Sequence, residues 1–157
     1  MLQDLAPQQD SLLEAFLFGG NRTAVSVYAE RFWHLQDRRC FYSGDRLSSP
    51  RSGEVDHFIP WSRYPCDSPF NLVLARKREN QRLRDALKPA AMRQRWERRN
   101  DTHLSALVAP EREGGFGAGE QERMLVRAVA GWVYGNGGLV APSACGRAGA
   151  HDSKLPC

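Results

Sequence analysis

Apolar side chains recur at helical spacing in two segments near the start of the chain. The first covers residues 10–18 and is followed by Gly19-Gly20, which is typical of a helix end. The second runs from about residue 22 to 38, and Asn21 can cap its start. The pattern therefore predicts an N-terminal helical extension over residues 1–39.

Between residues 40 and 89 the apolar runs become short and are separated by turn residues. The predicted elements, in order, are a hairpin over 40–47, a strand over 54–58, a long loop over 60–70, a strand over 72–74 and a helix over 76–87 that ends before Pro89. This order predicts a ββα arrangement. With helices on both sides of it, the fold class is predicted to be α+β.

Helical spacing returns after residue 89. It predicts helices over about 90–100 and 121–134, the two forming a C-terminal helical segment (90–134) that packs on the core. One apolar stripe of the second helix is predicted to face the core, and it consists of Met124, Leu125, Ala128, Val129 and Trp132. Residues 135–157 contain no periodic segment, so we expect a disordered tail.

Composition limits the size and class of the protein. With 157 residues and 41% hydrophobic content, the chain can bury one modest core. It contains no run of 18 apolar residues, so no membrane span is predicted. The first five residues, 1–5, lack the basic start of a secretory signal, and we expect a cytoplasmic protein without a membrane partner.

The net charge of +4 is modest, but the basic residues are unevenly distributed. The segment from Arg76 to Arg99 holds ten basic residues and three acidic ones. Such a cluster is suited to contacting phosphates. The alternative is a solvated helix face, which is the more common explanation of a charge run.

Candidate chemistry is concentrated in the ββα unit. His57 follows Asp56 at the end of the first predicted strand, and Asn80 lies in the helix after the second. A neutral histidine, with an ordinary pKa of about 6.5, can take a proton from water. Asp56 and Asn80 offer the oxygen ligands that Mg²⁺ prefers. Strand alternation alone would place Asp56 and His57 on opposite faces, so local twist must bring both toward one site.

Asn71 stands where the long loop meets the second strand. Its side chain could hydrogen-bond across the loop and hold the backbone around His57. An ordinary asparagine in a turn is the equally weighted alternative.

The segment Val55-Asp56-His57-Phe58-Ile59-Pro60-Trp61-Ser62, followed by Asn71-Leu72-Val73-Leu74-Ala75 and by Asn80, resembles the HNH endonuclease family over residues 40–87. The resemblance implies a ββα-metal nuclease core, here bounded at 40–89. It implies that His57 activates water, that Asp56 and Asn80 bind one Mg²⁺, Mn²⁺ or other divalent cation, and that Asn71 positions the histidine loop. It also implies DNA as the substrate, cut to leave 3′-hydroxyl and 5′-phosphate ends.

The resemblance is incomplete at the zinc knuckle that many family members carry. Where relatives have a CxxC pair, this chain has Cys40 and Ser43, and Glu79 replaces the cysteine before the final asparagine. Structural zinc is therefore not expected, and the hairpin should be held by packing. A lysine common in the family is Leu83 here, which would transfer phosphate contacts to Arg82 and Arg84.

Other side chains could contact nucleic acid. The residues expected to do so are Arg63, Arg76, Lys77, Arg82 and Arg84. Trp61 and Tyr64 could stack on bases or pin the loop to the body. The leading prediction is a metal-dependent DNA endonuclease. The alternatives are a noncatalytic nucleic-acid-binding module with the same fold and an effector nuclease controlled by a partner.

Overall fold

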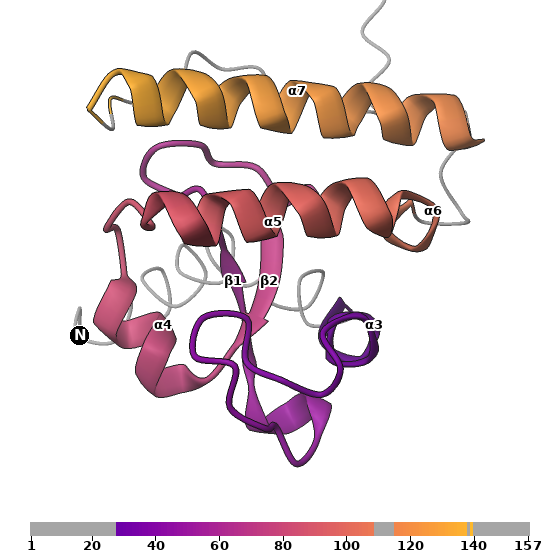
Figure 1. Ribbon diagram of the computed structural model, residues 1–157, viewed down its shortest axis with the longest axis vertical. Helices are drawn as coiled ribbons and strands as arrows, with labels where there is room; N and C mark the ends of the chain where they lie inside the picture. The colour runs from indigo at the N-terminus through magenta and orange to yellow at the C-terminus, as the bar shows by residue number, and fades with distance from the viewer. Residues whose placement is uncertain (1–27, 109–114, 138, 140–157) are drawn as a thin grey trace, which may run out of the picture.

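The computed structural model describes residues 28–108, 115–137 and 139. The elements are α3 (Tyr28–Leu35), a 3-10 turn (Pro50–Ser52), β1 (Glu54–His57), β2 (Leu72–Ala75), α4 (Lys77–Leu83), α5 (Ala90–Thr102), α6 (Leu104–Leu107) and α7 (Gly115–Gly135). In Figure 1, α5 and α7 run side by side in opposite directions, and α3 and α4 lie on either side of the strands. The predicted α+β class is confirmed. The predicted helix over 10–18 and most of the expected tail lie outside the described residues.

The ββα unit forms as the sequence pattern predicts. The strands β1 and β2 pair in antiparallel register, with Asp56 opposite Val73 and His57 opposite Leu72. All four residues of β2 are buried, in keeping with its continuous apolar run. One more hydrogen bond beyond the strands, from Phe58 N to Asn71 O at 2.7 Å, holds together the two ends of the long loop.

The helix α4 is shorter than the predicted segment 76–87. It ends at Leu83 because Arg84 adopts a positive φ of 35°, which stops the helical hydrogen-bond ladder. The ammonium of Lys88 then donates to the carbonyl oxygens of Arg84 and Ala86, at 3.3 Å and 3.2 Å. A lysine that satisfies carbonyls after a helix end is favourable both as a cap and with the helix dipole.

The hairpin predicted over 40–47 is present, with an isolated bridge between Arg39 and Arg46 and a positive φ at Gly44. It is attached to the outer edge of β2, because Phe41 N donates to Leu74 O at 2.9 Å. The side chain of Gln36 continues this edge, donating to Leu74 O at 2.8 Å and accepting from Leu74 N at 2.9 Å. The loop after α3 and the hairpin therefore cover the edge of the sheet.

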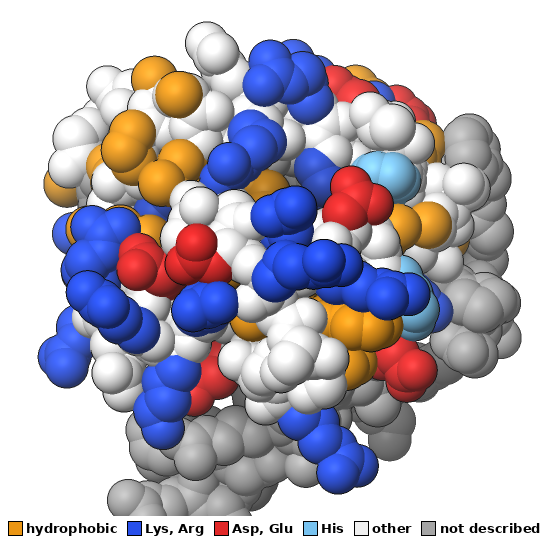
Figure 2. Space-filling view, turned by 60° about the horizontal axis from the view of Figure 1, so that its bottom comes forward, with side chains coloured by type: hydrophobic (Ala, Val, Ile, Leu, Met, Phe, Trp, Pro, Cys, Tyr) orange, Lys and Arg blue, Asp and Glu red, His pale blue; other side chains and the backbone are white. Residues whose placement is uncertain are grey.

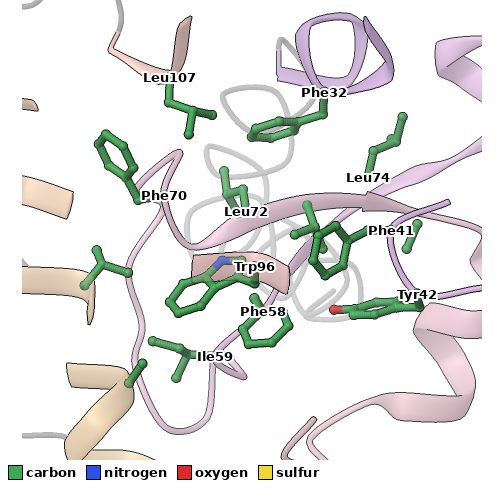
Figure 3. Packing of buried hydrophobic residues seen from close by; sticks show 14 of the residues in the cluster. Phe32, Phe41, Tyr42, Phe58, Ile59, Phe70, Leu72, Leu74, Trp96 and Leu107 are labelled. Carbon is green, nitrogen blue, oxygen red and sulfur yellow. The ribbon is translucent and has the colours of Figure 1, made fainter. Parts of the chain in front are cut away.

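One hydrophobic cluster joins α3, the sheet and the C-terminal helices. At its centre the rings of Phe58 and Trp96 stack at 4.6 Å with an interplanar angle of 8°, and Phe41 meets Phe58 edge to face at 5.9 Å (Figure 3). Aromatic pairs of this kind add roughly 0.5–1.5 kcal/mol beyond the area they bury. The first residue after His57 is thereby fixed in the core, which holds the end of β1 in place.

The predicted core stripe of α7 is wrong in register. Met124, Leu125 and Trp132 are exposed, at 59%, 37% and 38%. The buried hydrophobic side chains in the described part of this helix are Val126, Val129, Ala130 and Val133, so Val129 is the one correctly predicted member. Small and β-branched side chains face the core because they let the helix approach closely, whereas the larger apolar residues fill the opposite side.

The helix α7 also begins earlier than predicted. Glycine is a poor helix former, and the run from Gly115 to Gly119 gave no periodic signal. Gly119 is buried against the side chain of Val108, where a Cβ would have no room. Within the described residues, no helix combines the length and the apolar character needed to cross a membrane.

Candidate active site

Asp56 lies in β1, and its carboxylate points to the hairpin rather than to open solvent. The hydroxyl of Tyr42 donates to its Oδ2 at 2.6 Å. Burial raises the pKa of Asp56 above its ordinary value, while the hydrogen bond from Tyr42 and the charges of Lys88 and His57 oppose that rise. Asp56 is therefore a carboxylate held in a desolvated position by neighbouring donors and cations.

Lys88 is a buried cation whose charge acts on the Asp56 carboxylate, so it resembles a structural counter-ion. It is 2% exposed, and its ammonium lies 5.6 Å from the centre of the Tyr42 ring. Burial lowers its pKa, and the charges of Asp56 and Asp85 oppose that effect. In the sequence, Lys88 is one of the ten basic residues of the segment from Arg76 to Arg99. Its position directly after the predicted helix gave no sign of burial.

His57 ends β1 and turns toward the long loop. Its Nε2 lies 2.8 Å from Oδ1 of Asp67. The indole of Trp61 packs against the imidazole at a ring distance of 5.0 Å. Nδ1 makes no hydrogen bond within the described part of the chain, so one ring nitrogen is engaged and the other is open.

Asn71 is completely buried, and its side chain hydrogen-bonds across the loop. This agrees with the first of the two alternatives for Asn71, in which it holds the backbone around His57. Its Oδ1 accepts from Ile59 N at 2.9 Å, and its Nδ2 donates to Ile59 O at 3.3 Å and to Cys66 O at 3.4 Å. These bonds satisfy buried backbone groups on both arms of the loop. Asn71 therefore holds the segment that follows His57.

Asn80 lies on α4 and reaches β1, but its recorded partner there is Glu54. Nδ2 of Asn80 donates to Oε2 of Glu54 at 3.2 Å, and Lys77 Nζ lies 3.9 Å from Oε1 of the same carboxylate. Glu54 and Asp56 are two residues apart on one strand and so share a face. The Glu54 carboxylate is thus held between an amide and a lysine.

The donors at this site suit a hard divalent cation. Oδ1 of Asn80 makes no hydrogen bond to any described residue, and its Nδ2 bonds the Glu54 carboxylate, which shares a face of β1 with Asp56. Mg²⁺ needs few protein oxygens because it retains several waters. The described residues contain no group of three or more His, Cys, Asp and Glu side chains arranged to hold a metal. The donor set therefore fits a cation completed by water and substrate oxygens.

Cys40 takes part in the attachment of the hairpin to α4. It is a free, buried thiol whose sulfur accepts a hydrogen bond from Arg76 N at 3.2 Å. The guanidinium of Arg76 adds a bond to Arg46 O at 2.7 Å. These two hydrogen bonds join the hairpin to the start of α4.

The basic segment divides into surface and buried members. Arg76, Lys77, Arg82 and Arg84 are exposed, and acidic side chains lie among the basic ones on the face in Figure 2. Arg82 is paired with Glu79 at 2.8 Å. Arg99 is buried over the ring of Phe32, and burial lowers its pKa to about 9. The predicted phosphate footprint is therefore smaller than the run from 76 to 99.

Of the two loop aromatic residues that could stack on bases, one is exposed to solvent. Trp61 is 43% exposed, whereas Tyr64 is 2% exposed and belongs to the core. Tyr64 is thus placed to pin the loop and cannot stack on a base without leaving the core. Arg63 is half-buried, and its Nε has no hydrogen-bond partner among the described residues.

Asp67, Tyr42 and Lys88 were absent from the sequence-based site. A carboxylate in an Asp-Ser-Pro turn is common, so Asp67 carried no specific signal. Tyr42 and Lys88 lie outside the Asp-His and asparagine pattern, and only the tertiary fold brings them to Asp56.

Residues 40–87 match a family model described as HNH endonuclease. No curated protein matches the chain. The matched segment begins at the hairpin and ends after α4, and it includes all four residues of the predicted site.

Proposed function

Residues 40–87 belong to the HNH endonuclease family, and on this premise we propose that the chain hydrolyses DNA phosphodiester bonds with the help of one divalent cation. The HNH family generally acts on nucleic acid, and the domain match supports a nuclease-type activity. The main support for hydrolysis by this site is the hydrogen bonding of the two ring nitrogens of His57. One ring nitrogen is bound to Asp67, and the other has no partner within the described residues.

In the proposed reaction, Nδ1 of His57 takes a proton from a water molecule. The water oxygen then forms a bond to phosphorus while the bond from phosphorus to the 3′ oxygen breaks. The leaving oxygen takes a proton from solvent, giving a 3′-hydroxyl and a 5′-phosphate. A positioned general base contributes roughly 10²–10⁴-fold to such a step.

Asp56 and Asn80 are the residues proposed to hold the cation. A bound divalent cation neutralises charge on the phosphate and on the departing oxygen. Support comes from the oxygen donors that β1 and α4 bring together and from the unpaired Oδ1 of Asn80 among the described residues. Asn71 contributes indirectly, because it fixes the loop that begins after His57.

The proposed DNA contacts come from exposed residues around this site. Arg76, Lys77, Arg82 and Arg84 would contact phosphates, with Arg63 closer to the loop. Trp61 lies against His57 and is exposed, so its ring is available to a nucleotide beside the scissile phosphate. Because phosphate contacts carry no sequence information, the proposed binding has weak sequence preference.

Plasmid cleavage tests the proposal directly. The purified full chain with Mg²⁺ or Mn²⁺ should convert supercoiled plasmid to nicked or linear forms, and EDTA should stop the reaction. His57→Ala should reduce the rate by roughly 10²-fold or more. His34→Ala is the matched control because His34 is an exposed histidine on α3. Equal cleavage by His57→Ala and the wild type would remove the proposed mechanism.

One observation favours the noncatalytic alternative. The carboxylate of Asp56 is already supplied with a donor by Tyr42 and with positive charge by Lys88, so the protein itself partly neutralises it. A module that binds DNA without cutting it would show salt-sensitive affinity and no cation-dependent product in the same assay.

A further inference from the structure

We infer that Asp67 is a positioning residue, which fixes the neutral imidazole of His57 with its proton on Nε2 and leaves Nδ1 as the proton acceptor. The inference rests on the proposed role of His57 as the base. It concerns a residue in the long loop, ten positions after the histidine, that the family pattern of Asp56, His57, Asn71 and Asn80 does not include.

The contact itself defines the direction of the hydrogen bond. Nε2 of His57 and Oδ1 of Asp67 are 2.8 Å apart, which is the length of a charge-assisted bond. An ionised carboxylate can only accept a hydrogen bond, so the proton of the bond must belong to Nε2. In the neutral ring the other nitrogen, Nδ1, is then left with a free lone pair.

The loop backbone keeps Asp67 in place from both sides. On one side, Cys66 O accepts from Asn71 Nδ2 at 3.4 Å. On the other, Ser68 O accepts from Asn71 N at 2.8 Å, and Ser68 Oγ accepts from Phe70 N at 3.3 Å. Because Ser68 and Asn71 are buried, a shift of Asp67 would break several buried hydrogen bonds. Asn71 thus acts on His57 partly through Asp67.

The imidazole is also restricted on its face. The ring of Trp61 lies 5.0 Å away at 57°, so rotation of His57 about its Cβ–Cγ bond would meet the indole. The described residues offer Asp67 one recorded ion-pair partner, which is His57. The carboxylate and the indole together define both the tautomer and the orientation of the ring.

Asp67 would act through His57 in the reaction and not on the substrate. When Nδ1 takes the proton from water, the ring becomes an imidazolium whose Nε2–H still donates to the Asp67 carboxylate. The carboxylate stabilises that charge and does not itself take the proton. The same arrangement of carboxylate and histidine is used by catalytic triads on unrelated folds.

Asp67→Asn separates positioning from a general effect on structure. An asparagine can turn its NH₂ group toward Nε2, which then has to accept, and the ring proton moves to Nδ1. We expect kcat to fall by roughly 10²–10⁴-fold with KM nearly unchanged. Asp67→Glu retains an acceptor carboxylate and should recover most of the lost rate. Asp101→Asn is the matched control, because Asp101 lies on α5 and pairs with Arg123 and Arg127.

Nitrogen-15 NMR of the full chain reads the tautomer without any turnover. At about pH 8.5, where an ordinary histidine is neutral, the His57 signals, assigned with His57→Ala, should show a protonated Nε2 in the wild type and a protonated Nδ1 in Asp67→Asn. A wild-type ring protonated on Nδ1 would overturn the inference even if Asp67→Asn fails to fold. Unchanged tautomer and unchanged kcat in a folded Asp67→Asn would overturn it as well.

The two proposals fail in different ways. A wild type that does not cut DNA removes the proposed nuclease function, yet the NMR signals still report whether Asp67 sets the tautomer. A wild type that cuts through His57, with Asp67→Asn equally active, leaves the nuclease function intact and removes only the role of Asp67.

Discussion

The hydroxyl of Tyr42 donates a 2.6 Å hydrogen bond to the carboxylate of Asp56 across the space between the hairpin and β1. Burial raises the pKa of both groups, and in Tyr42 the charge of Asp56 raises it further. The protein thus keeps an acid in a position where its ionised form is poorly solvated. Such a position reduces stability. A role for the negative charge in function would explain why it is kept, and this leads to the first two predictions.

Asp56→Asn should increase the free energy of unfolding at pH 7 by about 0.5–2 kcal/mol while abolishing cleavage. The amide oxygen still accepts from Tyr42, and no charge is buried. Urea denaturation followed by circular dichroism measures the change. Glu30→Gln is the control, because Glu30 is an exposed acid on α3 and its substitution should have little effect.

The difference in unfolding free energy between Asp56→Asn and the wild type should depend on pH with a definite sign. The pKa of Asp56 in the folded state is raised above 3.8, its ordinary value, so between the two values the folded chain binds more protons than the unfolded chain. Stability of the wild type therefore falls as pH rises through this window. The advantage of Asp56→Asn should be complete above the window and should disappear below 3.8. An advantage that grows on acidification would contradict this explanation.

Tyr42→Phe should destabilise the protein by about 1.5–3 kcal/mol at pH 7, because the phenol is the donor to a charged, buried acceptor. The cost should fall to about 0.5–1.5 kcal/mol when Asp56 is already asparagine, because the remaining hydrogen bond is neutral, so a double-mutant cycle should give a clear coupling energy. Tyr64→Phe serves as the matched control, since Tyr64 is equally buried and its hydroxyl has no recorded bond among the described residues. Additive effects in the cycle would argue against the pairing.

Asn71→Ala should cost about 2–4 kcal/mol in unfolding free energy, because it leaves the N–H and C=O of Ile59 buried without their partner. Thermal or urea denaturation measures the loss. Asn136→Ala is the comparison, because Asn136 bonds Trp132 O from an exposed position at the end of α7. A loss at Asn71 no larger than the loss at Asn136 would mean that the loop does not depend on this amide.

Divalent cations should raise the melting temperature of the wild type, because a ligand that binds only the folded state stabilises it. At a cation concentration 100 times the Kd, the gain is about 2.7 kcal/mol. Asn80→Ala should lose this response without losing its fold in the absence of cation. Gln81→Ala, an exposed neighbour on α4, should respond as the wild type does. An equal response in all three proteins would place the cation elsewhere.

Binding of random duplex DNA should weaken steeply with salt. Lys77→Ala should lower affinity for all sequences alike and reduce the slope of log K against log[salt] by about 1. Fluorescence anisotropy at several salt concentrations provides the measurement. Arg127→Ala, which removes an exposed cation on α7, is expected to leave the slope unchanged. A slope near zero for the wild type would exclude phosphate contacts as the basis of binding.

The sequence predicts the ββα unit well because its signals are local. Short apolar runs, turn residues and Pro89 define the strands and the helix between residues 40 and 89, and the Asp-His and asparagine spacing leads to the family. The predicted core-facing side of α7 was wrong, because five apolar residues on one side of a helix resemble a core stripe whether or not a partner lies there. Packing into the common hydrophobic core selects the side with Val126 and Val133, and local spacing does not encode that packing.

The site is predicted in part for the same reason. His57 and Asn71 stand next to the elements that define them. Asp56 and His57, which were expected to turn toward one site, have different partners, Tyr42 and Asp67, as simple strand alternation would give. Asp67 and Lys88 belong to the site through contacts across the fold, which no spacing rule encodes. Burial of Arg99 was hidden by its position in a run of exposed arginines.

The side-chain amide of Gln36 also affects how the molecule meets other chains. It occupies both the N–H and the C=O of Leu74, and Phe41 N shares that carbonyl, so the outer edge of β2 offers no free pair of groups to an incoming strand. A two-stranded sheet with open edges would be a template for aggregation. Here the chain can retain a fully apolar β2 while remaining closed to strand addition on that side.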